Sequence, residues 1–320
     1  MQESLPGVSL ENDYLRVRIV DNAPRYIHHT DTIVGGQNGI ACLFDRKHHK
    51  NIFSLCGLQF VLANARPAQN KDIVKKIAPK PASMSLKQTG PNSAQLSRIV
   101  EEEGGLNTLI DYELAERHVD QTLTFWSNRD IDGFNTFCSS QMNQVQYTSL
   151  FMQGKLEQVA QPQWLEASSA GHSSDGRVYY RTFDPFGKTW ADHVLDNPVP
   201  RQKHTADPAS IAATLKAGFI VNEPNKCPFT GFYYGIIDDY CYLMIFREPA
   251  FYFWTCCGGA TQRNPTWDYG IAGKPAKAGE RVSYHLRLVF KPFAGVEDIL
   301  EEVRAFRGAY ADSLCGEFIE

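Results

Sequence analysis

The stretch of sequence that decides the fold is residues 228–293, which read PFTGFYYGIIDDYCYLMIFREPAFYFWTCCGGATQRNPTWDYGIAGKPAKAGERVSYHLRLVFKPF. Two apolar runs, 232–237 and 240–246, flank a pair of aspartates, which is typical of a β-hairpin. Residues 251–255 predict a third strand. Residues 282–290 predict a fourth, because apolar and polar side chains alternate there. The stretch therefore predicts the centre of a β-rich scaffold.

One segment inside this stretch, residues 261–269 (TQRNPTWDY), is predicted to be an exposed turn that binds a ligand. Trp267 offers an apolar plate for the face of a sugar ring, and Arg263 and Asp268 supply directed hydrogen bonds. A structural alternative stays open, in which Trp267 fills the rim of a β-sandwich and Asp268 caps a turn.

Strands are also predicted on the N-terminal side of this stretch. Residues 8–20 are predicted to form one half-buried strand, because apolar and charged side chains alternate there, and residues 40–44 form a short apolar run after glycine-rich turns. Three more strands are expected at 94–102, 108–115 and 118–126. Short turns between consecutive strands imply antiparallel pairing, because parallel neighbours need long crossovers.

The remaining segments are predicted to be loops and helices. Residues 63–93 are polar and are expected to form a long surface connection, and 161–204 a loop-rich segment with aromatic residues. Helices are expected at 207–218, after an aspartate and a proline, and at 296–306, where an apolar stripe would pack on the core. We expect one mainly β domain over residues 1–320, a large antiparallel β-sandwich with a few short helices.

Charge and hydropathy limit the classes of partner. The net charge is −4 and the basic residues are scattered, so a nucleic-acid partner is not expected. No apolar run is long enough to cross a bilayer, so no membrane association is expected. The N-terminus lacks the pattern of a signal peptide. We expect a cytoplasmic protein if Met1 is the native start, and a periplasmic or secreted one if a leader has been removed.

Cysteine and histidine spacing gives no metal or cofactor signature. The eight cysteines contain no C-x-x-C motif, and the nine histidines lack the spacing of a helical metal site. Only residues far apart in the sequence could assemble a metal site. We therefore expect neither a metal nor a cofactor.

Short motifs along the chain together resemble one superfamily. They are VSLEND from residue 8, GGQNGIACLFD from 35, YYG from 233, a Gly-Gly at 258, NPTWD from 264 and RLVFKPF from 287. This series resembles the galactose mutarotase-like supersandwich proteins, which include aldose 1-epimerases and domains of polysaccharide lyases and glycoside hydrolases. The late motifs are most similar to bacterial members placed near sugar degradation. The resemblance implies a β-sandwich and a carbohydrate substrate.

Acid/base chemistry at a sugar ring needs a proton donor and a proton acceptor on either side of the substrate. The resemblance implies that histidine, glutamate or tyrosine side chains fill these roles. In this chain we predict His172, His204, Tyr234 and Glu166 as catalytic residues. None of them matches an epimerase motif one to one, which weakens the case for simple anomeric interconversion.

Further residues in loops or on strand faces are predicted to bind the substrate. Arg247, Trp190 and His28 are polar or aromatic groups in such positions. His285 and Arg287 share one face of a predicted strand, where they either form the floor of a binding face or point into solvent.

These residues favour a carbohydrate-active enzyme that acts on an oligosaccharide or polysaccharide fragment as a lyase or glycoside hydrolase. The candidate arginine, histidine and tyrosine groups favour an anionic or partly oxidised sugar. One alternative is an epimerase or mutarotase acting on a free aldose. Another is a non-catalytic carbohydrate-binding sandwich with a platform of tryptophans, namely Trp164, Trp190, Trp254 and Trp267.

Overall fold

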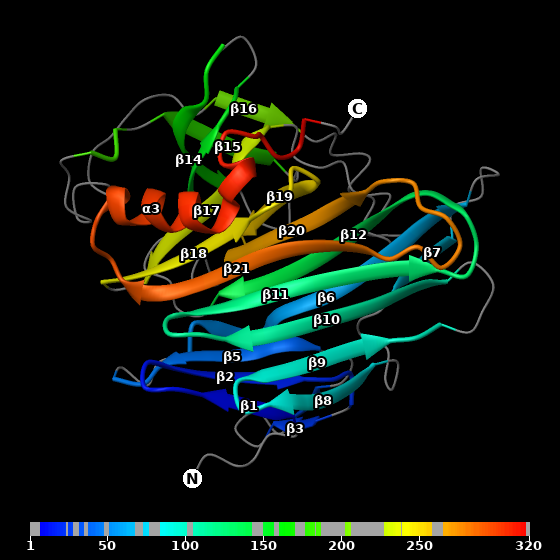
Figure 1. Cartoon of the computed structure of the whole chain (residues 1–320). Coiled ribbons are helices and arrows are strands. Elements are labelled where there is room, and N and C mark those ends of the chain that lie inside the picture. The colour runs from blue at the N-terminus through cyan, green and yellow to red at the C-terminus, as the bar shows by residue number, and fades with distance from the viewer. Residues whose placement is uncertain are drawn as a thin grey trace. The chain divides into compact units, whose positions relative to one another are not determined.

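The structure is a computed structural model, and its described strands form a mainly β fold. It describes residues 7–23, 25–27, 32–34, 38–47, 51–67, 73–76, 84–100, 105–142, 150–156, 160–169, 177–182, 184–186, 202–205, 227–237, 239–257 and 265–317. The described strands belong to two large antiparallel sheets, of eleven and eight strands, and a two-stranded sheet (Figure 1). The predicted fold class, a mainly β antiparallel sandwich, is confirmed.

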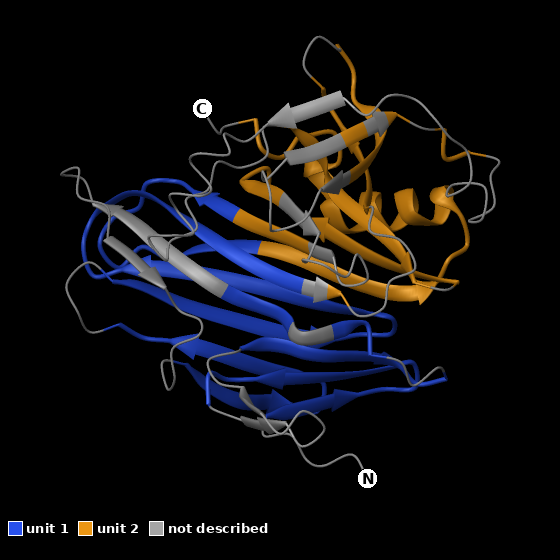
Figure 2. Ribbon diagram, turned by 180° about the vertical axis from the view of Figure 1, so that it is seen from behind, with its two compact units in different colours: residues 1–141, 271–284 blue, residues 142–270, 285–320 orange. Residues whose placement is uncertain are grey.

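The chain divides into two compact units (Figure 2). Unit 1 comprises Met1–Gln141 and Ile271–Tyr284, and unit 2 comprises Met142–Gly270 and His285–Glu320. The late segment Ile271–Tyr284 therefore belongs with the N-terminal part of the chain. The expectation of a single domain over residues 1–320 stays a prediction.

Unit 1 has strands in both large sheets. One sheet contains the order β1-β2-β5-β6-β12 with β7 beside β6, the other contains β8 to β11 in sequence order, and β3 pairs with β4. The bounds are β1 (Val8–Glu11), β2 (Leu15–Val20), β3 (Arg25–Ile27), β4 (Thr32–Val34), β5 (Gly39–Asp45), β6 (Phe53–Pro67), β7 (Ile73–Lys76), β8 (Ser85–Gly90), β9 (Ser93–Arg98), β10 (Leu106–Leu114), β11 (His118–Ser127) and β12 (Ile131–Met142).

Aromatic side chains from the two sheets meet in the core of unit 1. The ring of Phe125 on β11 lies 5.9 Å from that of Phe60 on β6 and 4.9 Å from that of Phe134 on β12. The late segment adds to this core, because the Tyr284 ring lies 6.1 Å from Phe134. Its backbone is also attached to β12, where the Ile271 N–H donates to Thr136 Oγ1 at 3.0 Å.

Unit 2 contains the remaining strands and the described helices. The order β16-β15-β14-β13-β17-β18-β21 runs in one sheet, and β19 neighbours β20 in the other. The bounds are β13 (Leu150–Gly154), β14 (Gln163–Ser169), β15 (Arg177–Thr182), β16 (Gln202–Thr205), β17 (Phe229–Ile237), β18 (Tyr240–Phe246), β19 (Phe251–Cys257), β20 (Pro265–Gly273), β21 (Val282–Pro292), α3 (Val296–Arg307) and the 3₁₀ turn η1 (Gly308–Tyr310). Strands β20 and β21 contribute to both units.

The hairpin of β17 and β18 is buried on both faces, which explains its unbroken apolar sequence. On one face, side chains such as Phe232 and Leu243 pack with Val303 of α3. On the other, Tyr242 faces Trp267 of β20, with ring centroids 5.6 Å apart. The predicted hairpin and the predicted C-terminal helix with its core-facing stripe are both confirmed.

Two predictions about loops are wrong. Residues 265–269 of the predicted turn belong to strand β20, in which Trp267, Asp268 and Tyr269 are buried. The predicted connection over residues 63–93 contains the end of β6, all of β7 and β8 and the start of β9. The lysines and glutamines of this segment are typical of a loop, but backbone pairing of β7 with β6 and of β8 with β9 stabilises strands there. The helix predicted at 207–218 lies outside the described residues.

Within the part of the chain that the structure describes, no helix is long and apolar enough to cross a membrane.

Two buried thiols in unit 2 predict a loss of stability in alkali. Burial raises the pKa of Cys227 and that of Cys315 from 9.0 to about 12. Below pH 9 both the folded and the unfolded state hold these protons, so the free energy of unfolding is not reduced by the two thiols. Between pH 9 and 12 only the unfolded state releases them. The free energy of unfolding should then fall by up to about 1.4 kcal/mol per pH unit for each thiol.

Urea unfolding measured from pH 8 to 11 tests this expectation. The Cys227→Ala variant should show a shallower decline, since it lacks one of the two thiols. A free energy of unfolding that stays constant up to pH 11 would contradict the prediction.

Candidate functional site

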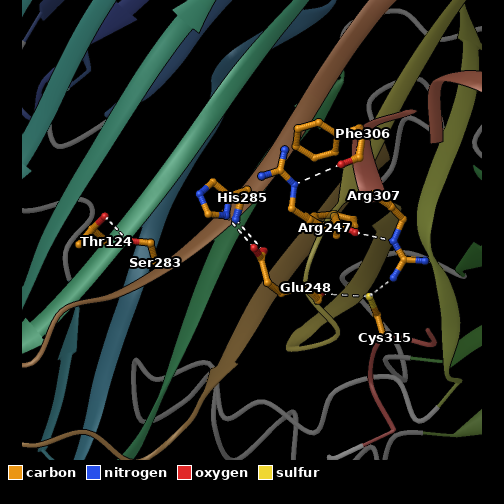
Figure 3. Close-up of polar contacts among 9 residues, drawn as sticks. Thr124, Arg247, Glu248, Ser283, His285, Phe306, Arg307 and Cys315 are labelled. Carbon is orange, nitrogen blue, oxygen red and sulfur yellow. Dashed lines mark hydrogen bonds and ion pairs between the residues drawn. The ribbon is translucent and has the colours of Figure 1, made fainter. Parts of the chain in front are cut away.

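Among the described residues of unit 2, a histidine on β21 and a glutamate just after β18 form the closest acid/base pair (Figure 3). His285 Nδ1 lies 2.6 Å from Glu248 Oε1, and the His285 backbone N–H donates to Glu248 Oε2 at 2.8 Å. A carboxylate only accepts hydrogen bonds, so Nδ1 carries a proton, and in the neutral form of the ring Nε2 presents its lone pair. Among the described residues, none hydrogen-bonds Nε2. The pair can therefore act as a proton acceptor with a fixed ring.

Local sequence places both members of this pair. His285 is on β21, where apolar and polar residues alternate, so its side chain points away from buried Leu286. Glu248 lies in the corner after β18, where Pro249 ends the apolar run. The imidazole is 33% exposed and the carboxylate 16%, so a ligand can reach the ring while the carboxylate is sheltered.

Arg247 lies beside His285 on the neighbouring strand end. Its backbone N–H donates to the His285 carbonyl oxygen at 3.0 Å, continuing the pairing of β18 with β21. Its Nε donates to the Phe306 carbonyl oxygen at 3.2 Å, and its guanidinium lies 4.5 Å from the Phe306 ring centroid. A cation suits this helix end, where carbonyl groups lack helical partners. Arg247 thus stabilises the C-terminus of α3 and sets a positive charge near His285 (Figure 3).

Arg287 was predicted to bind substrate, and the structure places it against α3. Its guanidinium lies 4.7 Å from the Phe306 ring centroid and 3.8 Å from the Glu302 carboxylate. Further along β21, Lys291 Nζ donates to Asp298 and Glu302 at 2.9 and 3.0 Å. This charged row joins β21 to α3, and a substrate-binding role for Arg287 stays a prediction.

Tyr234 and Glu166, both predicted to be catalytic, lie on one face of the sheet but do not meet. Tyr234 pairs across the strands with Phe151, and Phe151 pairs with Glu166. Two strand spacings of about 4.8 Å therefore separate them. Tyr234 is fully buried, and burial raises the pKa of its hydroxyl well above 10. A hydroxyl in this core position does not reach a substrate, whereas Glu166, at 5% exposed, has Arg181 as its other cross-strand neighbour.

Trp267 and Asp268 also lie deeper than predicted. Trp267 is 0% exposed and its ring occupies the space above Gly235, so it cannot be part of an exposed tryptophan platform. Asp268 is 3% exposed and, as the next residue of a strand, points to the opposite face of β20. A binding role for this buried carboxylate stays a prediction.

Several predicted site residues cannot be placed. His172, Arg263, Trp190 and His28 lie outside the described residues. His204 lies on β16 opposite Val178, where only its backbone is described.

Glu248 was not among the site residues predicted from the sequence. The available signal was a glutamate that lies two residues after the end of an apolar strand and directly before a proline. The pairing itself could not be seen, because 37 residues separate Glu248 from His285. Among the described residues, no group of three or more histidine, cysteine, aspartate or glutamate side chains is placed to hold a metal ion.

Comparisons with known proteins bear on the fold. No family model matches the sequence, and no curated protein matches it. A candidate aldose 1-epimerase from Escherichia coli K12 has a similar structure: identity is 11%, the TM-score is 0.50, and the match covers 89% of this chain and 98% of that one. The fold is that of the galactose mutarotase-like proteins. A galactose mutarotase-like protein from Clostridium acetobutylicum also matches, at 10% identity and a TM-score of 0.50, over 89% of this chain and 95% of that one.

The mutarotase-like fold confirms the resemblance inferred from the sequence motifs. Sequence identities this low show the fold alone, so the chemistry depends on this chain's own residues.

Proposed function

We propose that this protein is a carbohydrate-converting enzyme that interconverts the anomers of a free aldose by acid/base chemistry. The single observation that carries this proposal is the His285–Glu248 pair, in which the carboxylate fixes Nδ1 at 2.6 Å and leaves Nε2 open. Two solved structures of the same fold are described as an aldose 1-epimerase candidate and a galactose mutarotase-like protein, which supports a sugar as the ligand.

In this mechanism His285 Nε2 takes the proton from the anomeric hydroxyl of the sugar. The C1–O5 bond breaks as the aldehyde forms, and the ring oxygen takes the proton back from the imidazolium. Rotation about C1–C2 followed by the reverse steps gives the other anomer. Glu248 stabilises the imidazolium that forms in between, as an orienting carboxylate does for a histidine base.

Arg247 has a second role in this proposal. Its charge lies beside His285, and its position is fixed by the Phe306 carbonyl and ring. A rigidly held guanidinium stabilises the negative charge that develops on the ring oxygen as C1–O5 breaks. Among the described residues, the hydrogen bond of the Arg247 side chain uses Nε, and the guanidinium lies over the Phe306 ring, so the terminal nitrogens can bind a ligand.

His285→Asn should reduce the rate of anomer interconversion by about 10²- to 10⁴-fold, the usual contribution of a general acid/base group. Proton NMR of freshly dissolved single anomers of several aldoses measures this rate directly. His118→Asn is the matched control, because His118 is another partly exposed histidine beside a carboxylate, Asp120, but lies in unit 1. Equal rates for wild type, His285→Asn and enzyme-free buffer would rule out the proposed function.

The lyase or hydrolase hypothesis is the alternative, and two further assays test it. A lyase acting on uronic-acid polysaccharides would produce ultraviolet absorbance from a new C=C bond, and a hydrolase would produce new reducing ends. The solved structures named above are not described as lyases or hydrolases. Because Arg247 carries a positive charge beside His285, the panel of aldoses should include uronic acids.

A further inference from the structure

The corner that carries Glu248 is held by the C-terminal segment of the chain. Residues 247–250 connect β18 to β19, and Cys315 lies against this corner (Figure 3). The Cys315 thiol donates to the Glu248 carbonyl oxygen at 3.4 Å, and the Gly316 N–H donates to the Pro249 carbonyl oxygen at 3.3 Å. Two successive carbonyls of the corner are thus bound by two successive residues near the C-terminus.

Cys315 is itself fixed from two sides. Its backbone pairs with Phe229 at the start of β17, through N–H···O distances of 3.0 and 2.7 Å. Buried Arg307 donates to the Phe246 carbonyl oxygen at 2.9 Å through Nε, and its Nη2 lies 3.8 Å from the Cys315 sulfur. Arg307 therefore connects Phe246, which directly precedes the corner, with Cys315, which hydrogen-bonds to the corner.

We propose that Cys315 and Arg307 are positioning residues for the His285–Glu248 pair. Through the backbone carbonyls of Phe246 and Glu248, they fix the corner so that the carboxylate meets both the backbone and the ring of His285. The geometric part of this proposal stands on the structure, and its catalytic meaning rests on the proposed function.

The physical reason is the narrow range of a hydrogen bond. The carboxylate makes contacts of 2.6 and 2.8 Å to two atoms of one residue, and a corner shift of about 1 Å would lengthen both beyond the usual limit. A thiol is a weak donor, so the loss of its hydrogen bond should cost little global stability. Groups that orient a reacting side chain commonly change activity by about 10- to 100-fold.

The test is the tautomer of His285, read from the ¹⁵N shifts of its ring nitrogens in histidine-labelled protein at a pH where imidazoles are neutral. His285→Asn identifies the signals. Wild type should show the Nδ1–H tautomer almost alone, because the carboxylate holds that proton. Cys315→Ala should raise the share of the Nε2–H tautomer, and Cys315→Ser, which keeps a donor, should restore the wild-type pattern.

Cys241→Ala is the matched control. Cys241 is another buried cysteine of unit 2, on β18, and it belongs to the apolar cluster that contains Leu243 of β18 and Val303 of α3 rather than to the corner. It should lose packing energy and leave the tautomer unchanged. If Cys315→Ala does not fold, Cys315→Val removes the donor while filling the space.

The outcomes separate the two proposals. A tautomer change in Cys315→Ala with a roughly tenfold lower rate and an unchanged KM supports both. A tautomer change in Cys315→Ala, with no anomer interconversion by wild type or by any variant, supports the positioning role and overturns the proposed function. A wild-type tautomer pattern in Cys315→Ala and Cys315→Val overturns the positioning role whatever the rate.

Discussion

Replacing Gly235 by alanine should destabilise the protein by about 3 kcal/mol or more, because a Cβ there would overlap the ring of Trp267. The ring cannot move aside easily. It is 0% exposed, it packs against Tyr242 with ring centroids 5.6 Å apart, and its backbone carbonyl accepts a 2.9 Å hydrogen bond from the Tyr233 hydroxyl. Urea unfolding followed by tryptophan fluorescence and far-ultraviolet circular dichroism measures the loss.

A second substitution should separate the clash from any other effect of Gly235→Ala. Trp267→Leu alone removes a buried ring, but in the Gly235→Ala background it also removes the overlap, so the two changes should be strongly non-additive. Gly279→Ala is the control for backbone effects, since Gly279 has a φ of 77° and nothing lies within 4 Å of its added Cβ. It should cost about 1 kcal/mol. Additive losses for Gly235→Ala and Trp267→Leu would show that the ring does not fill this space.

Arg307→Met should cost about 3 to 5 kcal/mol, because Arg307 is a buried hub of hydrogen bonds. Its guanidinium donates to the carbonyl oxygens of Thr230 and Phe246 in the sheet and to those of Ala311 and Ser313 beyond α3. Methionine keeps the apolar stem of the side chain but leaves these acceptors without donors. Thermal and urea unfolding measure the loss.

Lysine at this position should be nearly as destabilising as methionine, because an ammonium group cannot reproduce the planar fork of donors. The backbone leaves room for the planar guanidinium at Gly231, which has a φ of 75° and where a Cβ would overlap the guanidinium. Arg304→Ala, an exposed change in the same helix turn, should stay within about 0.5 kcal/mol of wild type. Wild-type stability in Arg307→Lys would show that charge alone, not the fork, holds the segment.

The strands that the sequence predicted best are those whose side chains alternate or stay apolar throughout. The runs at 118–126 and 282–290 correspond to β11 and β21, and 296–306 corresponds to α3. Their periodicity records which face is buried, and that pattern is local in the sequence.

Strand β20 shows why other elements could not be predicted. Its start reads Pro-Thr-Trp-Asp-Tyr, which has the composition of a turn. The segment becomes a strand because Gly235, 30 or more residues earlier, leaves room for the Trp267 ring. Such a fit between distant residues has no local signal.

The site was harder to predict than the fold for a similar reason. His285 was chosen because it is a polar residue on a strand face, and it does carry an acid/base partner. Tyr234 was chosen on residue type alone and lies in the buried apolar cluster that contains Leu243 of β18 and Val303 of α3. The two residues differ in exposure: the Tyr234 side chain is covered by α3, whereas the His285 side chain is partly exposed. The burial of Tyr234 therefore depends on α3, which follows both residues in the chain.

The membership of Ile271–Tyr284 in unit 1 has a consequence for synthesis on the ribosome. The other part of this unit ends at Gln141, so roughly 130 residues must be translated before its last strands exist. At about 5 to 20 residues per second this takes on the order of 6 to 26 s. During that time β12 lacks its partner at Ala276, and Phe134 lacks the ring of Tyr284. A nascent chain stalled before residue 271 should therefore be a substrate for chaperones that recognise exposed aromatic strands, whereas the released full-length chain should not.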